Sequence, residues 1–307
     1  MSRGGNGTQE AQEAQEETKL LVPLVLLVFR SLFPRFFPAV LVLSWALCVP
    51  FFAAQLDLPL EPIRDSGASV TGAFEGWYKN ADGSYSILVG YFNRNQKQTL
   101  DIPVGPDNHI DPGGPDQGQP THFLPRRQWG VFTITVPKDF GNKRLTWTIT
   151  ANGQTTSVPL HLDPLWIVEP FEDAGVGNTP PVVRFQPGGT AYTGPPRGFA
   201  VSLNAKPGEP IPLTVWVTDD GKQPPEARPR QGPPASISWS LFRGSGPVTF
   251  ENPRPQVAIE DGKASTTAKF SAPGEYILRA QVNDASGDGG GGFQCCWTNV
   301  HVKVTVK

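Results

Sequence analysis

Two adjacent cysteines, Cys295 and Cys296, have the most distinctive chemistry in this chain of 307 residues. Neighbouring Cα atoms across a trans peptide are about 3.8 Å apart, shorter than the usual disulfide range of about 4.4 to 6.8 Å. The sequence leaves several states open: one buried and one exposed thiol, a vicinal disulfide, intermolecular pairing, or metal binding. Because adjacent strand residues point to opposite faces, we do not expect the two thiolates to chelate one ion.

The same segment, residues 284–299, also contains a run of glycines and two large aromatic residues, Phe293 and Trp297. Glycine gives a loop backbone conformational freedom, and large aromatic side chains are common anchors at binding interfaces. We therefore predict that Phe293, Cys295, Cys296 and Trp297 form a ligand-binding group. The alternative is that the two aromatic residues close the open end of a hydrophobic core.

A second stretch with chemical potential is the proline-rich segment 105–127, where Asp107, Asp111 and Asp116 lie near His109 and His122. Clustered oxygen ligands are what calcium prefers. The spacing matches no EF-hand, however, and several prolines stiffen the segment. We expect a solvated surface loop, with a metal site and a partner-binding loop as alternatives. A hydrolase that uses Asp107 or Asp111 is the enzymatic alternative.

The remaining basic residues of interest are predicted to have structural roles. Arg126 and Arg127 point to opposite faces of a strand and so form no fork on one anion. We expect a solvated pair beside a packed Trp129. His161 and His301 fall in strand patterns and are expected to face outwards.

Motifs and charge exclude several classes of function. The chain lacks the Gly-x-Ser-x-Gly, His-Glu-x-x-His and phosphate-loop signatures, so we predict no catalytic residues, no metal, no cofactor and no enzymatic activity. The net charge of −2 and the pI of about 6.1 give no basic face for nucleic acid. With so few cysteines, stability must come from core packing rather than from a disulfide framework.

The residues above must be positioned by β-strands. Short apolar runs with a period of two are separated by turn signals, and no helix of ordinary length is visible after the N-terminal region. Asn80–Gly83 and Asn152–Gly153 are hairpin signals. The fold class is therefore predicted as all-β, with two β-sandwich domains in tandem after an N-terminal hydrophobic export or anchor helix. Strands are expected at 70–79, 84–93, 99–102, 130–136, 144–151, 155–162, 199–204, 213–218, 236–242, 248–250, 264–270 and 276–283.

The C-terminal part, residues 181–307, contains a spaced set of aromatic, glycine, apolar and acidic residues: Trp239, Gly246, Val248, Phe250, Phe270, Gly274, Tyr276, Leu278 and Asp284. In these residues it resembles the PKD-like and bacterial immunoglobulin-like β-sandwich modules. The resemblance implies adhesion, spacing or display, and it carries over no catalytic residue. It also implies that Tyr276 is the tyrosine of the sandwich corner, whose hydroxyl returns to the backbone. The N-terminal β domain matches no named family.

The predicted domain boundaries follow from composition. Residues 1–54 are a polar tail plus a signal peptide or signal anchor, because Arg30 and Arg35 precede an apolar run that ends in small residues. Residues 55–68 are a linker, 69–168 the first sandwich, 169–181 a second linker, and 182–307 the immunoglobulin-like sandwich. This layout predicts a periplasmic, cell-surface or secreted location, with a membrane contact if the N-terminal segment is not cleaved.

These features favour an exported, non-catalytic protein that binds or spaces an extracellular ligand, either a glycan or a surface protein. The alternative is an accessory docking subunit of an envelope enzyme or transport assembly.

Overall fold

The computed structural model describes residues 64–222, 232–233, 235–284 and 295–307. Residues 62–307 form one compact unit, which contains two β-sandwich regions. The predicted export segment 1–54, most of the first linker and Phe293 lie outside the described residues. Among the residues described, no helix has the length and apolar character needed to cross a membrane.

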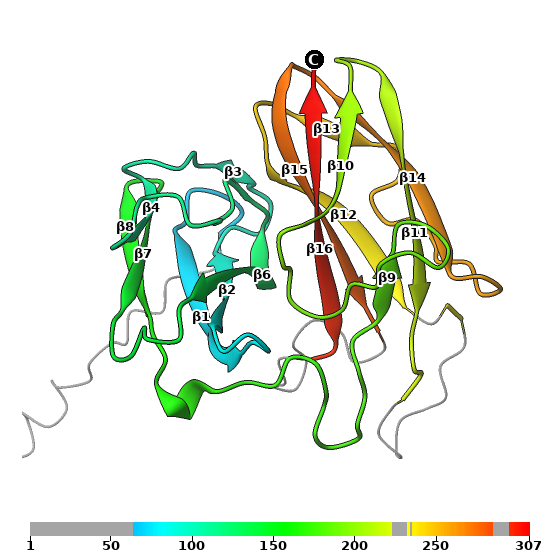
Figure 1. Ribbon diagram of the computed structural model, residues 1–307. Coiled ribbons are helices and arrows are strands. Elements are labelled where there is room, and N and C mark those ends of the chain that lie inside the picture. The colour runs from blue at the N-terminus through cyan, green and yellow to red at the C-terminus, as the bar shows by residue number, and fades with distance from the viewer. Residues whose placement is uncertain (1–63, 223–231, 234, 285–294) are drawn as a thin grey trace, which may run out of the picture. The chain divides into compact units, whose positions relative to one another are not determined.

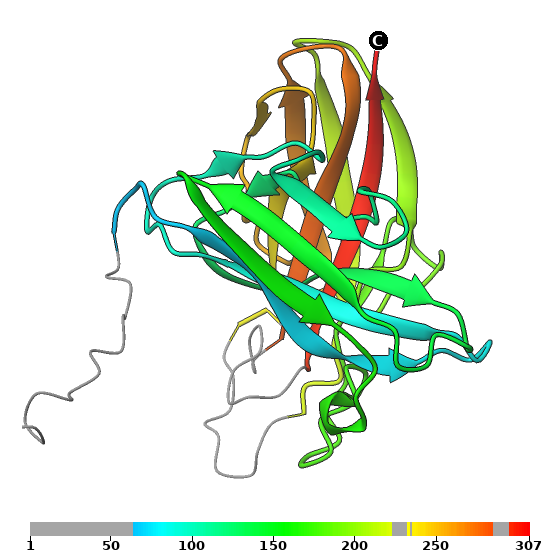
Figure 2. The same cartoon turned by 90° about the vertical axis from the view of Figure 1, so that its left-hand side faces the viewer.

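The first sandwich packs two three-stranded sheets, ordered β1-β2-β6 and β4-β7-β8. Asn152 and Gly153 both adopt positive φ, 51° and 74°, which is the geometry of the predicted two-residue hairpin between β7 and β8. Figure 2 shows this green hairpin in front of the cyan strand β1, and β8 contacts β1 directly. The strands are β1 (Val70–Lys79), β2 (Tyr85–Asn93), β4 (Asn108–Asp111), β6 (Arg126–Val136), β7 (Leu145–Ala151) and β8 (Gln154–Leu160), with a small pair β3 (Leu100–Asp101) and β5 (His122–Phe123).

The core of the first sandwich is built around Trp147, which is fully buried between Phe123 and Phe132. Strand β2 is central in its sheet and buried on both faces, as its two apolar parities predict. Phe242, which belongs to a strand of the second sandwich, is also part of this core.

The second sandwich has the strand orders β10-β16-β15-β12 and β13-β14-β11-β9. Strand β10 runs parallel to β16, and the other pairs are antiparallel, which is the arrangement of an immunoglobulin-like sandwich. Figure 1 shows the red strand β16 between β10 and β15. The strands are β9 (Val182–Arg184), β10 (Phe199–Ala205), β11 (Pro210–Thr218), β12 (Ser236–Arg243), β13 (Val248–Phe250), β14 (Lys263–Phe270), β15 (Gly274–Asn283) and β16 (Trp297–Val306).

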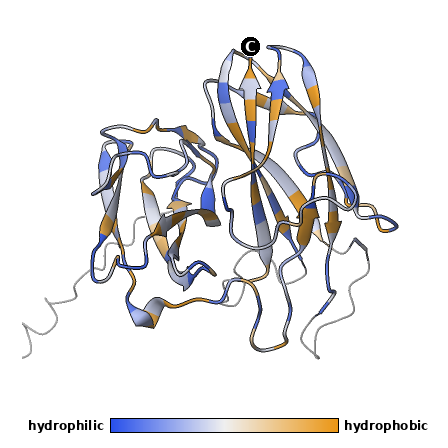
Figure 3. Cartoon of the chain, viewed as in Figure 1, coloured by the Kyte–Doolittle hydropathy of each residue, from blue (hydrophilic) through white to orange (hydrophobic). Residues whose placement is uncertain are grey.

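In the sheet β10-β16-β15-β12, the side chains that point into the second sandwich are those that the period of two predicts. Trp239 is 3 % exposed, and alternate residues of β15 from Tyr276 to Val282 are fully buried. The Tyr276 hydroxyl donates to the Ala272 carbonyl oxygen at 2.8 Å, which confirms the predicted tyrosine corner. Apolar and polar residues alternate along many of the strands (Figure 3).

The outer face of the same sheet departs from a half-buried pattern. Every residue from Leu278 to Val282 of β15 and from Trp297 to Val302 of β16 is buried, on both parities. A strand buried on both sides needs a second layer. That layer is the first sandwich, and the polar side chains between the two are described next.

Candidate functional site

The two sandwiches meet across a polar seam formed by the outer face of β15 and β16. Arg279 and Gln281 of β15, and Asn299 and His301 of β16, are each at most 9 % exposed. Side chains of these types are rarely this well buried unless they are paired. Period-two reasoning predicts that such residues face solvent, and the expectation that His301 faces outwards is wrong because another β layer covers it.

Arg279 links the seam through its guanidinium group. Its Nη1 donates to Gln128 Oε1 at 3.2 Å, and its Nη2 donates to the Trp129 carbonyl oxygen at 3.1 Å. On its own sheet, Nε donates to Asn299 Oδ1 at 2.9 Å. The Asn299 amide in turn donates to the Gly130 carbonyl oxygen at 2.8 Å. These contacts attach β15 and β16 to the backbone of β6.

The side chain of Glu75 in β1 is buried and binds the same part of β6. Arg127 Nη2 donates to Glu75 Oε1 at 2.6 Å, and the Gly130 N–H donates to Oε2 at 2.7 Å. Burial raises the pKa of Glu75 to about 7, although Arg127, the Gly130 N–H and Arg279 each lower it. The Arg127 guanidinium also lies over the Trp129 ring, 3.8 Å from its centroid. Arg127 is therefore a packed ion-pair partner, which corrects the expectation of a solvated pair.

His301 lies on the Phe242 ring with the two ring centroids 4.2 Å apart. Burial, with Arg279 and Arg243 as smaller contributions, lowers the pKa of His301 to about 3. The imidazole is therefore neutral at physiological pH. A neutral ring is what an apolar neighbour and nearby guanidinium groups favour.

The predicted ligand-binding group of the C-terminal segment is divided by the structure. Phe293 is outside the described residues, whereas Cys295, Cys296 and Trp297 are at most 4 % exposed. The Trp297 ring packs on Gly130, whose φ is 52° and where any Cβ atom would overlap the indole. Trp297 is thus not a solvent-exposed anchor, because it fills the seam.

The two cysteines are joined in a disulfide, with Cα atoms 3.1 Å apart across a cis peptide bond. Across a trans peptide, which was the expectation, the two Cα atoms would lie farther apart, at about 3.8 Å. Cys296 Sγ lies 3.3 Å from the Asn178 carbonyl oxygen, so the pair packs against the connection between the sandwiches.

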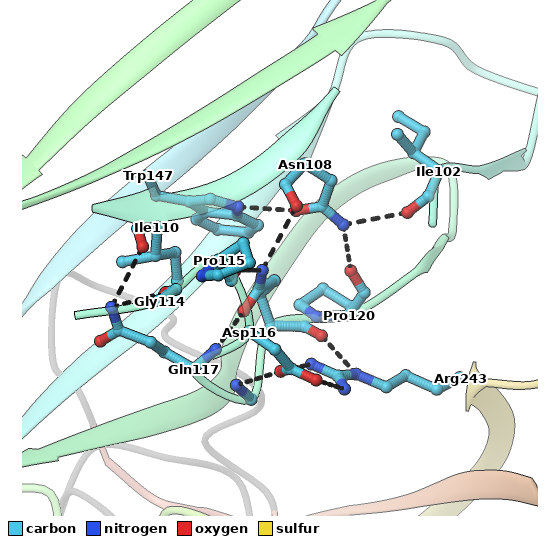
Figure 4. Close-up of polar contacts among 12 residues, drawn as sticks. Ile102, Asn108, Ile110, Gly114, Pro115, Asp116, Gln117, Pro120, Trp147 and Arg243 are labelled. Atoms are coloured by element: carbon cyan, nitrogen blue, oxygen red, sulfur yellow. Dashed lines mark hydrogen bonds and ion pairs between the residues drawn. The ribbon is translucent and has the colours of Figure 1, made fainter. Parts of the chain in front are cut away.

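The proline-rich stretch 105–121 is fixed in place by buried amides (Figure 4). The fully buried Asn108 donates to the carbonyl oxygens of Ile102 and Pro120 at 2.9 and 2.8 Å, and accepts from Trp147 Nε1 at 3.0 Å. Strand β4 begins at Asn108 and includes the buried Ile110. Part of this stretch is therefore core, which corrects the expectation of a solvated loop.

Arg243 at the end of β12 fastens this stretch to the second sandwich. Its guanidinium makes a bidentate pair with Asp116 at 3.0 and 2.8 Å and donates to the Gln119 carbonyl oxygen at 2.6 Å (Figure 4). The hydrogen bonds from Arg243 lower the pKa of the Asp116 carboxyl group. Bidentate Arg–carboxylate pairs fix orientation as well as distance.

The other residues of the predicted metal alternative lie apart. His109 pairs with Asp111 at 3.4 Å, and His122 pairs with Asp101 at 2.6 Å. Within the part of the chain that is described, no three His, Cys, Asp or Glu side chains are grouped so that they could hold a metal ion.

A cleft of about 920 Å³ opens where the seam reaches the edge strand β12. Both sandwiches line it: β6 contributes Gln128, while β12 and β15 contribute hydroxyl and amide side chains. Of the lining residues that the structure describes, only Arg254 is charged. A neighbouring hollow of about 590 Å³, lined in part by the His122–Asp101 pair, shares Leu124, Trp239 and Ser240 with the cleft. We call the larger hollow the seam cleft; its polar lining is Gln128, Ser236, Ser238, Ser240, Gln256, Gln281 and Asn283.

Comparison with known proteins found solved structures of low similarity. No family model matches the chain, and no curated protein matches it significantly. Among solved structures, the D00-D0 domain of intimin is 13 % identical, with a TM-score of 0.25, covering 78 % of this chain and 100 % of that one. The titin immunoglobulin tandem A164-A165 is 12 % identical, with a TM-score of 0.22, covering 78 % and 99 %. Nothing in these similarities is specific to PKD modules.

Sequence reasoning missed most of the seam. Glu75, Arg279, Asn299 and His301 looked like ordinary polar strand positions. The available signal was the strand 274–283, where the parity opposite Tyr276 includes Ile277 and the long side chains Arg279 and Gln281. An apolar residue on a nominally solvated face is a weak indication of a covered sheet.

Proposed function

We propose that the protein is an exported, non-catalytic binding protein of the envelope or extracellular space, and that the seam cleft holds its ligand. The predicted N-terminal export segment supports this location. Ligand clefts are common at domain interfaces, where two surfaces converge. The observation that carries the proposal is that both sandwiches contribute to one cleft of about 920 Å³.

The chemistry of the lining favours a neutral oligosaccharide over a charged ligand. Serine hydroxyls of β12 and amides of β6 and β15 can donate to and accept from sugar hydroxyls, because each group has both functions. The proline rings of Pro253 and Pro255 supply apolar wall. A short neutral segment of a surface protein would use the same groups and is the second ligand to test.

The bonded seam gives the cleft a fixed shape. Arg279 and Arg243 of the second sandwich bind Trp129 and Asp116 of the first, and Glu75 binds the backbone of β6 at Gly130. A preorganised site loses less conformational entropy when its ligand binds. The same rigidity supports a spacing role, since the two sandwiches would move as one body.

The test is direct binding of a panel of neutral oligosaccharides to the purified fragment that begins at residue 62. Ser238→Tyr fills the cleft from β12, and Ser265→Tyr places the same side chain on β14, in the other sheet of this sandwich. We expect at least one oligosaccharide to bind wild type and Ser265→Tyr, and binding to Ser238→Tyr to fall at least about tenfold.

Two results would contradict the proposal. One is that no oligosaccharide or neutral peptide of the panel binds. The other is that binding occurs but Ser238→Tyr and Ser265→Tyr lower it equally, which would place the ligand elsewhere.

A further inference from the structure

Three consecutive large apolar residues are exposed directly after the first sandwich. Leu165 is 90 % exposed, Trp166 47 % and Ile167 59 %, and they include the end of the short 3₁₀ helix η1 (Pro164–Trp166). The ribbon turns hydrophobic just after η1 (Figure 3). Contiguous exposed apolar side chains on a folded protein commonly mark an interaction site. We call these three residues the LWI ridge.

The ridge is held rigidly by strand β1. The Trp77 indole donates to the Asp163 carbonyl oxygen at 2.8 Å, and the Val168 N–H donates to the Trp77 carbonyl oxygen at 3.0 Å. The Asp163 carboxylate accepts from the Leu165 N–H at 2.9 Å and so caps η1. The Trp166 ring packs on Phe74, with ring centroids 5.3 Å apart, yet about half of its surface and more of Leu165 and Ile167 remain exposed.

The charged residues that flank the ridge in the sequence are acidic. Residues 161–181 contain four acidic residues and no Lys or Arg. Two basic side chains from elsewhere contact the far end of this segment: Arg197 packs on Phe171, and Lys222 donates to the Gly177 carbonyl oxygen. Asp163, Glu169 and Glu172 are exposed on either side of the ridge. An apolar ridge with an acidic border is complementary to an apolar pocket with a basic rim. The same border repels the anionic headgroups of a membrane surface.

We propose that the LWI ridge is a docking site for a second, different protein, whose surface has an apolar pocket bordered by Lys and Arg side chains. Trp166 and Ile167 enter the pocket, and Glu169 and Glu172 face its rim. This interaction is separate from ligand binding in the seam cleft, because the described lining of that cleft includes no residue of the ridge.

The experiment places a photo-reactive amino acid at position 165 of the full chain, expressed in the cells that make the protein. Leu165 has almost no packing contact to lose, since 90 % of its surface is exposed. The matched control is the same amino acid at Ile259, which is 64 % exposed in the other sandwich. Adducts are identified by mass spectrometry, and the identified protein is then purified and titrated with wild type and variants.

We expect one protein adduct from position 165 that is absent from position 259. With the purified partner, Trp166→Ala should weaken binding at least about tenfold, as for an aromatic anchor. The pair Glu169→Lys and Glu172→Lys should weaken it similarly, and about 1 M salt should remove the charge contribution. An unchanged urea-unfolding midpoint for each variant shows that the fold is intact, whether or not the seam cleft binds an oligosaccharide.

Four results would overturn the proposal: no adduct, an adduct with lipid only, an adduct with a second copy of this chain, or a partner whose affinity ignores both the charge reversal and Trp166→Ala.

Discussion

Glu75 and His301 should cancel each other's effect on stability between pH 4.5 and 6.5. The folded state raises the pKa of Glu75 from 4.5 to about 7, so in this range it holds a proton that the unfolded chain has released. The folded state lowers the pKa of His301 from 6.5 to about 3, so the unfolded chain binds a proton there that the folded protein does not. Stability rises with pH where the unfolded state binds more protons, and falls where the folded state does.

Replacing Glu75 by Gln removes one of these two opposing slopes. Each uncompensated proton changes the free energy of unfolding by about 1.4 kcal/mol per pH unit. The unfolded Glu75 is half protonated at pH 4.5 and the folded one has released part of its proton at pH 6.5, so the two pH units correspond to about 2 kcal/mol. Glu75→Gln should therefore lose about 2 kcal/mol more than wild type as the pH falls from 6.5 to 4.5. The neighbouring Arg127, Arg243 and Arg279 stay charged throughout and add no slope of their own.

The assay is urea unfolding of wild type and Glu75→Gln at several pH values, with the difference between the two proteins taken at each pH. His301→Gln is the mirror control: its stability should rise relative to wild type as the pH falls over the same range. Parallel pH profiles for wild type and Glu75→Gln would refute the reasoning, because they would mean that Glu75 titrates normally in the folded protein.

Three further outcomes follow from the packing. Trp239→Ala should destabilise the protein by about 3 to 5 kcal/mol, measured by urea unfolding, because it removes a large buried aromatic side chain; a loss under about 1 kcal/mol would contradict the burial of its ring. Gly130→Val should weaken the contact between the two sandwiches, because its Cβ would overlap the Trp297 ring. Limited proteolysis should then cut the connection 163–181 faster than in wild type. An unchanged cleavage rate would count against the packed seam. Intact mass with and without reductant should differ by two hydrogen atoms with no dissociation of a dimer, whereas an unchanged mass would show free thiols.

The sequence by itself determined the elements and the inward faces of the sandwiches. Alternation from Tyr276 to Val282 and the turn at Asn152–Gly153 depend on neighbours along the chain, and local sterics impose them before any tertiary contact forms. Trp239 and the tyrosine corner follow from the same local pattern. For that reason the all-β class and most strand positions were predictable.

Only the tertiary structure decided which outer faces are covered. A period of two places Arg279 and His301 on the face opposite the core, and it does not say whether water or another domain lies there. The seam needs Gly130 of one sandwich and Trp297 of the other, which are far apart in the sequence. Contacts between residues so far apart in the sequence depend on how whole sheets dock, so no local pattern encodes them. The seam cleft is formed by the same docking, and for that reason it could not be predicted from the sequence.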